Sequence, residues 1–327
     1  TLTLQLSAAS GRDISYDYGV TSGTATGSGT DYTFADGSNT ISAGATTQTL
    51  TVTLDDDTID ENNETVVVTI SNLSNAASGT NTAHTLTITD DDAQPTIAFS
   101  EASSSGSEAT GTKTLTIQLS TASGLATTVA YAVSGGTATK TSGANDNDYA
   151  FTDGTATIAA GNTTSTVDIT IVNDSYDEAD ETVAITLSSP TNSSLGTNNI
   201  YTYTITDDDQ TPTIGFSAAT SSGAESATPT FTVSLSAASG QDITVAYADA
   251  GTGSATSGGT DYTLSSGTAT ISASSDAGGS NTSTTFSLSV NDDALDEDNE
   301  TIDLSISSPT NSSLSTTTAH TYTITDN

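Results

Sequence analysis

Three clusters of carboxylates recur along the chain, and they are the residues best suited to chemistry. Each cluster has the spacing Asp-x-x-x-Glu-x-x-Glu-Thr and is followed by a run of alternating apolar residues. The central glutamates, Glu61, Glu178 and Glu297, lie 117 and 119 residues apart. That period matches one small domain and is too long for a solenoid turn or propeller blade. We expect these acids to bind a cation, and calcium, which prefers oxygen ligands, is the natural candidate.

The charge balance restricts the partners of the chain. It has 40 Asp and Glu against 3 Lys and Arg, a formal net charge of −37. Nucleic acids and anionic membranes are poor partners, because binding to phosphates needs basic side chains. No apolar run is long enough to span a membrane, so no membrane insertion is expected in this segment. Its first residues do not form a signal peptide, and we expect any export signal to lie outside it.

The composition also restricts the kind of core and of metal site. The chain has no Cys, Met or Trp, which excludes disulfides and thiolate ligands and suits a protein exposed to oxidants. Hydrophobic residues make up 33% of it, enough for thin sandwich cores built from one face of each strand. Acidic chains can be disordered, but the alternating apolar runs argue for a folded protein.

The repeats align over their whole length and define the expected domains, 1–92, 93–209 and 210–327. An acidic triplet ends each of the first two, and only two residues and a proline separate it from the next strand. We therefore expect stiff junctions. The first repeat lacks the opening Pro-Thr-Ile-x-Phe strand. We favour a segment of a longer array over the alternative, in which another chain donates that strand.

The middle repeat shows the expected fold most clearly. Its apolar residues alternate in short runs with period two, separated by Gly, Asn, Ser or Pro, over 96–99, 115–119, 129–133, 156–158, 167–171, 183–187 and 201–205. About seven short strands per repeat indicate an immunoglobulin-like sandwich. The sequence thus predicts an all-β chain of tandem immunoglobulin-like Greek-key β-sandwiches arranged as a rod.

Strand alternation places most of the carboxylates of this repeat at one end. Every second loop of such a sandwich lies at the same pole, so Glu108, Asp148, 174–181 and 207–209 should meet there. The loops of the opposite pole carry no charge in this repeat. Such crowded carboxylates repel one another unless a cation lies among them. The alternative, a salt-adapted surface, would scatter the acids over both poles.

Calcium fits this donor set better than other divalent ions. It accepts 6–8 oxygen ligands in flexible geometry, whereas magnesium demands a stricter octahedron and zinc favours His or Cys. The two histidines, His84 and His320, precede the last strand of their repeats, away from the acids. We expect both to be surface or strand-edge residues.

Taken together, these motifs resemble tandem Calx-beta domains, which occur in sodium–calcium exchangers and in large bacterial surface proteins. The resemblance covers all three repeats and rests on Pro-Thr-Ile-x-Phe, Gly-Thr-Asp-Tyr, the glutamate motif and the closing Asp-Asp-Asp. It implies calcium ligands from a glutamate before the second strand, the Asp of Asp-Tyr, the acids before the sixth strand and those after the last strand. Asn173 and Asn327 stand where acids are usual.

The implied ligands are given by repeat. The first offers Asp31, Asp56, Asp57, Glu61, Asp90 and Asp91; the second offers Glu108, Asp148, Asp174, Glu178, Asp207 and Asp208; the third offers Glu225, Asp261, Asp292, Asp293, Glu297 and Asp326. The last glutamate of each motif, Glu64, Glu181 or Glu300, is expected instead to orient its loop.

These expectations combine into one function and its alternatives. We expect a calcium-binding structural array in an extracellular fibre, adhesin stalk or surface layer of the cell, stiffened by calcium at the domain junctions. Its partners would be neighbouring repeats, with lateral or end-to-end self-assembly. The alternative is an adhesion module that recognises a glycan or protein through the uncharged loops, where 189–195 and 308–314 are identical. Recent duplication would also produce that identity. No catalytic motif is present, so we expect no enzyme, and a signalling role would need an intracellular setting.

Overall fold

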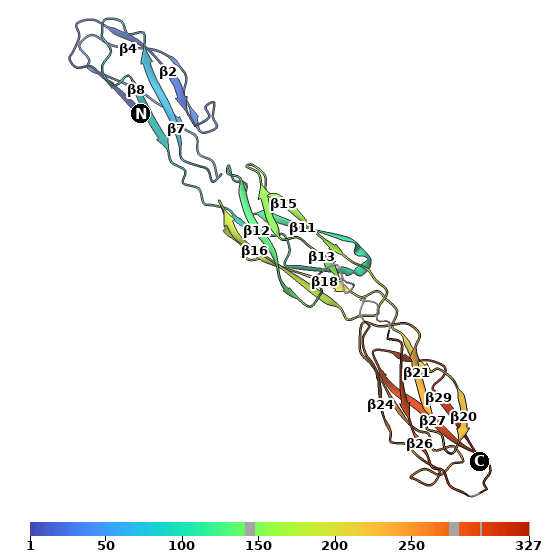
Figure 1. Cartoon of the computed structure of the whole chain (residues 1–327). Helices are drawn as coiled ribbons and strands as arrows, with labels where there is room; N and C mark the ends of the chain where they lie inside the picture. Colours follow the sequence, from blue (N-terminus) through green and yellow to red (C-terminus); the bar gives the residue numbers. More distant parts are fainter. Residues whose placement is uncertain (141–147, 275–280, 295, 327) are drawn as a thin grey trace.

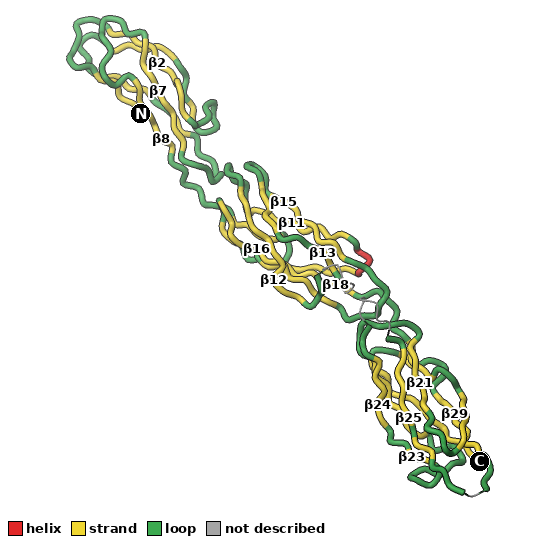
Figure 2. The backbone as a smooth tube through the Cα atoms, in the orientation of Figure 1, coloured by secondary structure: helices red, strands yellow, loops and turns green. Residues whose placement is uncertain are grey.

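Three β-sandwiches follow one another along an elongated chain in the computed structural model (Figure 1). The structure describes residues 1–140, 148–274, 281–294 and 296–326, so Asn327 lies outside the described residues. The prediction of tandem all-β, immunoglobulin-like sandwiches is confirmed. Among the described residues the helical structure consists of one short 3-10 turn, η1 (Glu108–Thr110), at the end of the middle sandwich that faces the third (Figure 2).

The middle repeat contains two five-stranded sheets. One sheet has the order β10 (Ser103–Ser107), β18 (Ile200–Thr206), β16 (Glu181–Thr191), β12 (Thr127–Gly136) and β14 (Gly154–Ile158). The other has the order β13 (Tyr149–Ala150), β15 (Thr164–Ile171), β11 (Thr112–Leu119), β9 (Thr96–Phe99) and β17 (Ser194–Leu195). All seven predicted strands are present. Alternate side chains of the two inner faces, such as Ile117, Ile169 and Ile185, form its buried core.

The third repeat has the same plan. One sheet has the order β20 (Thr220–Ala224), β29 (Ala319–Thr325), β27 (Glu300–Thr310), β22 (Ile243–Asp249) and β24 (Gly267–Ile271). The other contains β25 (Ser283–Ser287), β21 (Thr230–Leu235), β19 (Thr213–Phe216) and β28 (Ser313–Leu314), with β23 (Tyr262–Thr263) and β26 (Ser289–Val290) as a separate pair.

The first repeat has fewer strands around a smaller core. Its larger sheet has the order β4 (Gly37–Ile41), β2 (Ile14–Gly23), β7 (Glu64–Ser71) and β8 (Ala83–Ile88). The strands β1 (Leu2–Gln5) and β5 (Thr47–Leu50) form one pair, and β3 (Tyr32–Thr33) and β6 (Thr53–Leu54) form another. Its buried residues fall into two small clusters, around Val66 and around Tyr16, in place of one continuous core.

The two histidines differ, and the expectation for His320 was wrong. His84 is exposed on the edge strand β8, as expected. His320 is 5% exposed, lies between Phe216 and Phe231, and hydrogen-bonds Ser221 Oγ at 2.7 Å through its Nε2. The difference follows from the strands nearby, because β19 and β20 supply Phe216 and Ser221, and no described strand of repeat 1 takes their place.

A glycine at the end of the third long strand starts the loop that leads to the acidic pole. A Cβ on Gly136 would overlap the carbonyl group of Thr182, and its φ of 124° is one that favours glycine. That carbonyl accepts hydrogen bonds from Thr137 N at 2.9 Å and Ala138 N at 3.0 Å. Gly23 makes the same close approach to Thr65 in repeat 1. The chain therefore leaves the sheet at equivalent points in both repeats.

Consecutive sandwiches touch through one recurring contact. The loop before the sixth long strand of one repeat meets the turn after the second long strand of the next, in isolated bridges between Asp60 and Ser123 and between Asp177 and Ser239. All four residues are buried, at 6%, 1%, 6% and 2% exposure. The acidic end of each repeat thus packs directly on the opposite end of its successor.

Candidate metal centres at the acidic poles

Carboxylates from separate loops converge at the acidic pole of each repeat. Three groups offer oxygen atoms that all lie within 4.8 Å of one another: Asp31, Glu61 and Glu64; Glu108, Asp208 and Asp209; and Asp261, Glu297 and Glu300. Their loops meet because strand direction alternates, as the sequence predicted. Such a convergence of hard oxygen donors suits a divalent cation.

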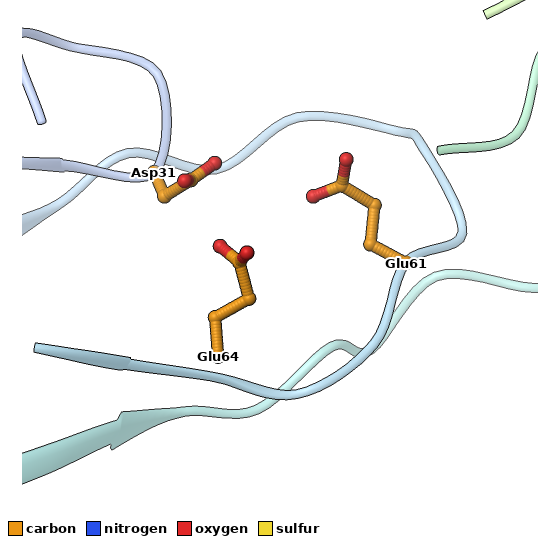
Figure 3. Close-up of side chains that lie close together, drawn as sticks. All are labelled: Asp31, Glu61 and Glu64. Atoms are coloured by element: carbon orange, nitrogen blue, oxygen red, sulfur yellow. The ribbon is translucent and has the colours of Figure 1, made fainter. Parts of the chain in front are cut away.

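The first centre combines three segments. Figure 3 shows Asp31, Glu61 and Glu64 pointing toward one another from the loop before β3, the loop before β7 and the start of β7. Burial, a hydrogen bond with Asp31 and the charges of Asp31 and Glu61 raise the pKa of Glu64 to about 7. Burial and the neighbouring acids, Asp31 first, also raise the pKa of Glu61. The group therefore resists full ionisation without a counter-cation.

The second centre contains buried carboxylate oxygens without hydrogen-bond partners. Glu108 lies in η1 and is 6% exposed, and its Oε2 has no partner among the described residues; the same holds for Asp209 Oδ2. Burial, followed by the charges of Asp174, Asp207, Asp209 and Asp208, raises the pKa of Glu108 to about 7. An unpartnered buried acid costs free energy unless a cation accompanies it. These oxygens therefore fit a cation site.

The third centre surrounds a small space. Asp261, Glu297 and Glu300 line a pocket of about 10 Å³ together with Glu225 and Asp293, roughly the room for one water-sized particle. Burial, followed by the nearby Asp326, raises the pKa of Glu225. Burial, a hydrogen bond with Asp261 and the surrounding charges raise the pKa of Glu300. The size and donor type of the pocket suit a single ion.

The predicted ligands are distributed unevenly over these centres. Asp31, Glu61, Glu108, Asp208, Asp261 and Glu297 belong to the three groups. Glu225 and Asp293 line the third pocket. Asp326 lies close enough to contribute, after burial, to the raised pKa values of Glu225 and Glu297. Asp56, Asp57, Asp90 and Asp91 surround Asp92 in the first repeat and raise its pKa, after its burial. The assignment of these residues as calcium ligands stays a prediction.

Several other predicted ligands hold loop backbone in place. Asp174 Oδ1 accepts from Tyr176 N at 2.8 Å, and Asp207 Oδ1 accepts from Glu178 N at 3.1 Å. Asp148 accepts from Thr139 N. Glu178 lies at the junction against Gly240, outside the second group. Asp292 is exposed and lies in the loop between β26 and β27.

Three members of the groups were not predicted as ligands: Glu64, Glu300 and Asp209. Glu64 and Glu300 begin β7 and β27 and turn their carboxylates into the centres. Their recurrence as the last glutamate of each motif is the signal in the sequence, although the expected role was to orient the loop. Asp209 ends the acidic triplet of the middle repeat, and its sequence position alone does not distinguish it from Asp207 and Asp208.

The identical loops 189–195 and 308–314 share one turn geometry. Ser189 and Asn192 have φ values of 48° and 53°, and Asn192 Nδ2 donates to Ala126 O at 2.8 Å. The equivalent Asn311 has a φ of 52° and donates to Asp242 O at 3.0 Å. Polar residues that tolerate left-handed backbone are needed there. The fold of the turn therefore accounts for the residue types at these positions, and repeat 1 meets the same need with Asn72 and Asn75.

The raised pKa values predict how the stability of the metal-free chain depends on pH. The folded chain binds the Glu108 proton more tightly than the unfolded chain, whose ordinary pKa is 4.5. Protonation of Glu108 therefore stabilises the folded chain, fully below about pH 4.5, and this stabilisation is lost as pH rises through about 7. In chelator, the free energy of unfolding of repeat 2 should fall between pH 5 and 8 by at most about 3 kcal/mol. Denaturant titrations at several pH values measure this, and stability rising over that interval would contradict it.

No helix in the described part of the chain is long and apolar enough to cross a membrane.

Comparison with known proteins identifies the kind of domain. The sequence profile of the Calx-beta domain matches residues 1–92, 90–209 and 207–327. No match was found among curated proteins. Among solved structures, the CBD12 fragment of CALX1.2 is 16% identical over 70% of this chain and 99% of that one, with a TM-score of 0.33. The apo form of the Calx CBD1 domain is 22% identical over 36% of this chain and all of that one, with a TM-score of 0.32.

Proposed function

The chain belongs to the Calx-beta family, and from that premise we propose that it is a calcium-binding structural array. Calcium would be held at the acidic poles by the carboxylates of the three groups. Bound there, it supplies positive charge that neutralises the crowded acids.

One observation carries the proposal: Glu61 serves both the first centre and the first junction. Its carboxylate lies in the group with Asp31 and Glu64, while a Cβ on Gly124 of the next repeat would lie 2.7 Å from its Cγ. The neighbouring Asp60 makes the junction contact itself. An ion that fixes Glu61 would therefore also fix the surface on which the next repeat rests.

We place this array outside the cell, as a segment of a fibre, adhesin stalk or surface layer. Extracellular modules bind calcium with dissociation constants of about 10⁻⁴–10⁻³ M, which matches the millimolar calcium found there. The lack of cysteine suits a protein that is stabilised by metal in an oxidising setting. The role as an adhesion module rests on the identical loops alone, and recent duplication of a repeat also produces that identity.

Small-angle X-ray scattering with and without chelator tests the proposed stiffening. With calcium, the maximum dimension should be that of three sandwiches held end to end. In chelator, repulsion among the acids should let the junctions bend, so the distribution of interatomic distances should broaden and its maximum should shift. Magnesium at equal concentration is the control for ionic strength. An identical scattering curve in calcium and chelator would count against the proposal.

A further inference from the structure

The turn Ala-Ser-Gly, which occurs in all three repeats, forms the receiving side of each junction. At the first junction, Ser123 Oγ donates to Asp60 O at 3.1 Å and to Asp60 Oδ2 at 3.2 Å, and Gly124 N donates to Asp60 O at 3.0 Å. At the second, Ser239 Oγ donates to Asp177 O at 3.0 Å and Gly240 N donates to it at 3.1 Å. The two junctions are thus chemically the same.

The third copy of this turn, at Ser10 and Gly11, has the same internal geometry. Ser10 O accepts from Gly44 N at 2.8 Å, as Ser123 O does from Gly161 N at 2.8 Å. Ser10 Oγ accepts from Arg12 N at 3.0 Å, and Ser123 Oγ accepts from Leu125 N at 3.1 Å. The receiving turn is therefore formed before anything docks on it. We call Ser10, Gly11 and Arg12 the open turn.

The glycine of the open turn has no explanation within its own repeat. A Cβ on Gly124 or Gly240 would lie 2.7 Å from the Cγ of Glu61 or Glu178, so a larger residue at those positions would displace a glutamate of the preceding repeat. A Cβ on Gly11 would meet nothing within 4 Å, and its φ is outside the left-handed range. Glycine at position 11 thus leaves the space that a glutamate of a docked repeat would need.

Charge complementarity identifies the partner. Arg12 is exposed and is one of only 3 basic residues in the chain. It stands at the position of Gln241, whose Nε2 donates to Asp177 Oδ2 at 3.4 Å. An arginine there gives an incoming aspartate a stronger, charge-assisted partner. The chain itself offers such a loop at Asp296 and Glu297, both exposed at the acidic pole of repeat 3.

We propose that the open turn is a docking site for the acidic loop of another Calx-beta repeat, which Asp296 of a second copy of this chain can supply. The inference rests on the proposed stacking of repeats, but it does not require that the ion be calcium. It predicts head-to-tail contacts between chains with the same bonds as the two junctions within the chain.

Cysteine cross-linking tests this, because the natural chain has no cysteine. One full-length variant carries Ser10→Cys and a second, of different tag size, carries Asp296→Cys; they are mixed in a glutathione redox buffer. The mixed disulfide should form about tenfold faster than with Gly79→Cys in place of Ser10→Cys, the factor for a preference of about 1.4 kcal/mol. Adding Gly11→Val should abolish the preference, whereas adding Gly79→Val should not. Equal rates for both pairs, or no effect of Gly11→Val, would overturn the inference.

An intrachain pair separates this failure from failure of the proposed function. Asp60→Cys with Ser123→Cys in one chain should form a disulfide, because these residues are paired at the first junction. If that bond forms and the bond between chains does not, only the inference about the open turn is overturned. If neither forms, the stacked junction is wrong and the proposed array is overturned with it.

Discussion

Chelating divalent ions should lower the melting temperature of the middle repeat by up to about 7 °C. Millimolar calcium at a site with a dissociation constant of about 10⁻⁴–10⁻³ M adds about 0.4–1.4 kcal/mol to the stability of the folded state. For a domain of this size, each kcal/mol corresponds to about 3–5 °C. Differential scanning calorimetry in calcium, in magnesium and in chelator measures the shift.

The change in melting temperature caused by Glu108→Gln should have opposite signs in chelator and in calcium. In chelator the variant should raise the melting temperature, because it removes a buried carboxyl group whose ionisation is opposed by burial and by four aspartates. In calcium it should lower that temperature, because it removes a ligand. Glu101→Gln in the same repeat is the matched control, since Glu101 is half exposed and pairs with Lys113 at 3.3 Å. Its effect should stay within about 1 kcal/mol in both conditions. A change in melting temperature of the same sign in both conditions would contradict a cation site at Glu108.

Gly124→Val should weaken cation binding in repeat 1, although the substitution lies in repeat 2. The new side chain would occupy the space of the Glu61 Cγ and carboxylate. Because that side chain is flexible, we expect it to rotate out of the group with Asp31 and Glu64. Loss of one carboxylate ligand should lower the calcium affinity of that centre by about tenfold or more, the equivalent of about 1.4 kcal/mol.

Calcium titration calorimetry of the full chain reports this as the weakening of one class of sites. Gly79→Val is the control, because a Cβ there meets nothing within 4 Å and Gly79 is not part of the open turn. Gly240→Val should displace the Glu178 side chain in the same way, but Glu178 lies outside the second group, so the same loss of affinity is not expected there. An unchanged titration for Gly124→Val would show that the first junction and the first centre are independent.

The strands and the acidic poles could be predicted because their signals are local. Alternation of apolar residues identified all seven predicted strands of the middle repeat, and strand direction then placed the acids at one end. Strand β10 escaped prediction because its sequence, Ser-Ser-Ser-Gly-Ser, has no apolar residue; it forms by pairing in parallel with β18. The burial of His320 likewise depends on Phe216 and Phe231, which lie far from it in sequence.

The detailed ligand groups and the junctions depend on distances between loops, which spacing does not encode. Glu64 and Asp209 are in the centres because of where β7 begins and where the acidic triplet passes η1. The Ala-Ser-Gly turn recurs in all three repeats, but that recurrence does not indicate that Ser123 pairs with Asp60 of the preceding repeat. The residues of the turn that contact the preceding repeat are small, and no sequence pattern distinguishes them from an ordinary turn.

The parallel pairing of β10 with β18 has a mechanical consequence. Ser103 to Ser107 pair in register with Thr202 to Thr206, near the two points where the chain enters and leaves the sandwich. A pull transmitted along the rod draws these strands in opposite directions along their own axes. The hydrogen bonds between them are then loaded in shear and must break together, whereas a hairpin pulled from its open end yields one bond at a time. The third repeat has the same arrangement in β20 and β29, so both repeats are built to bear tension.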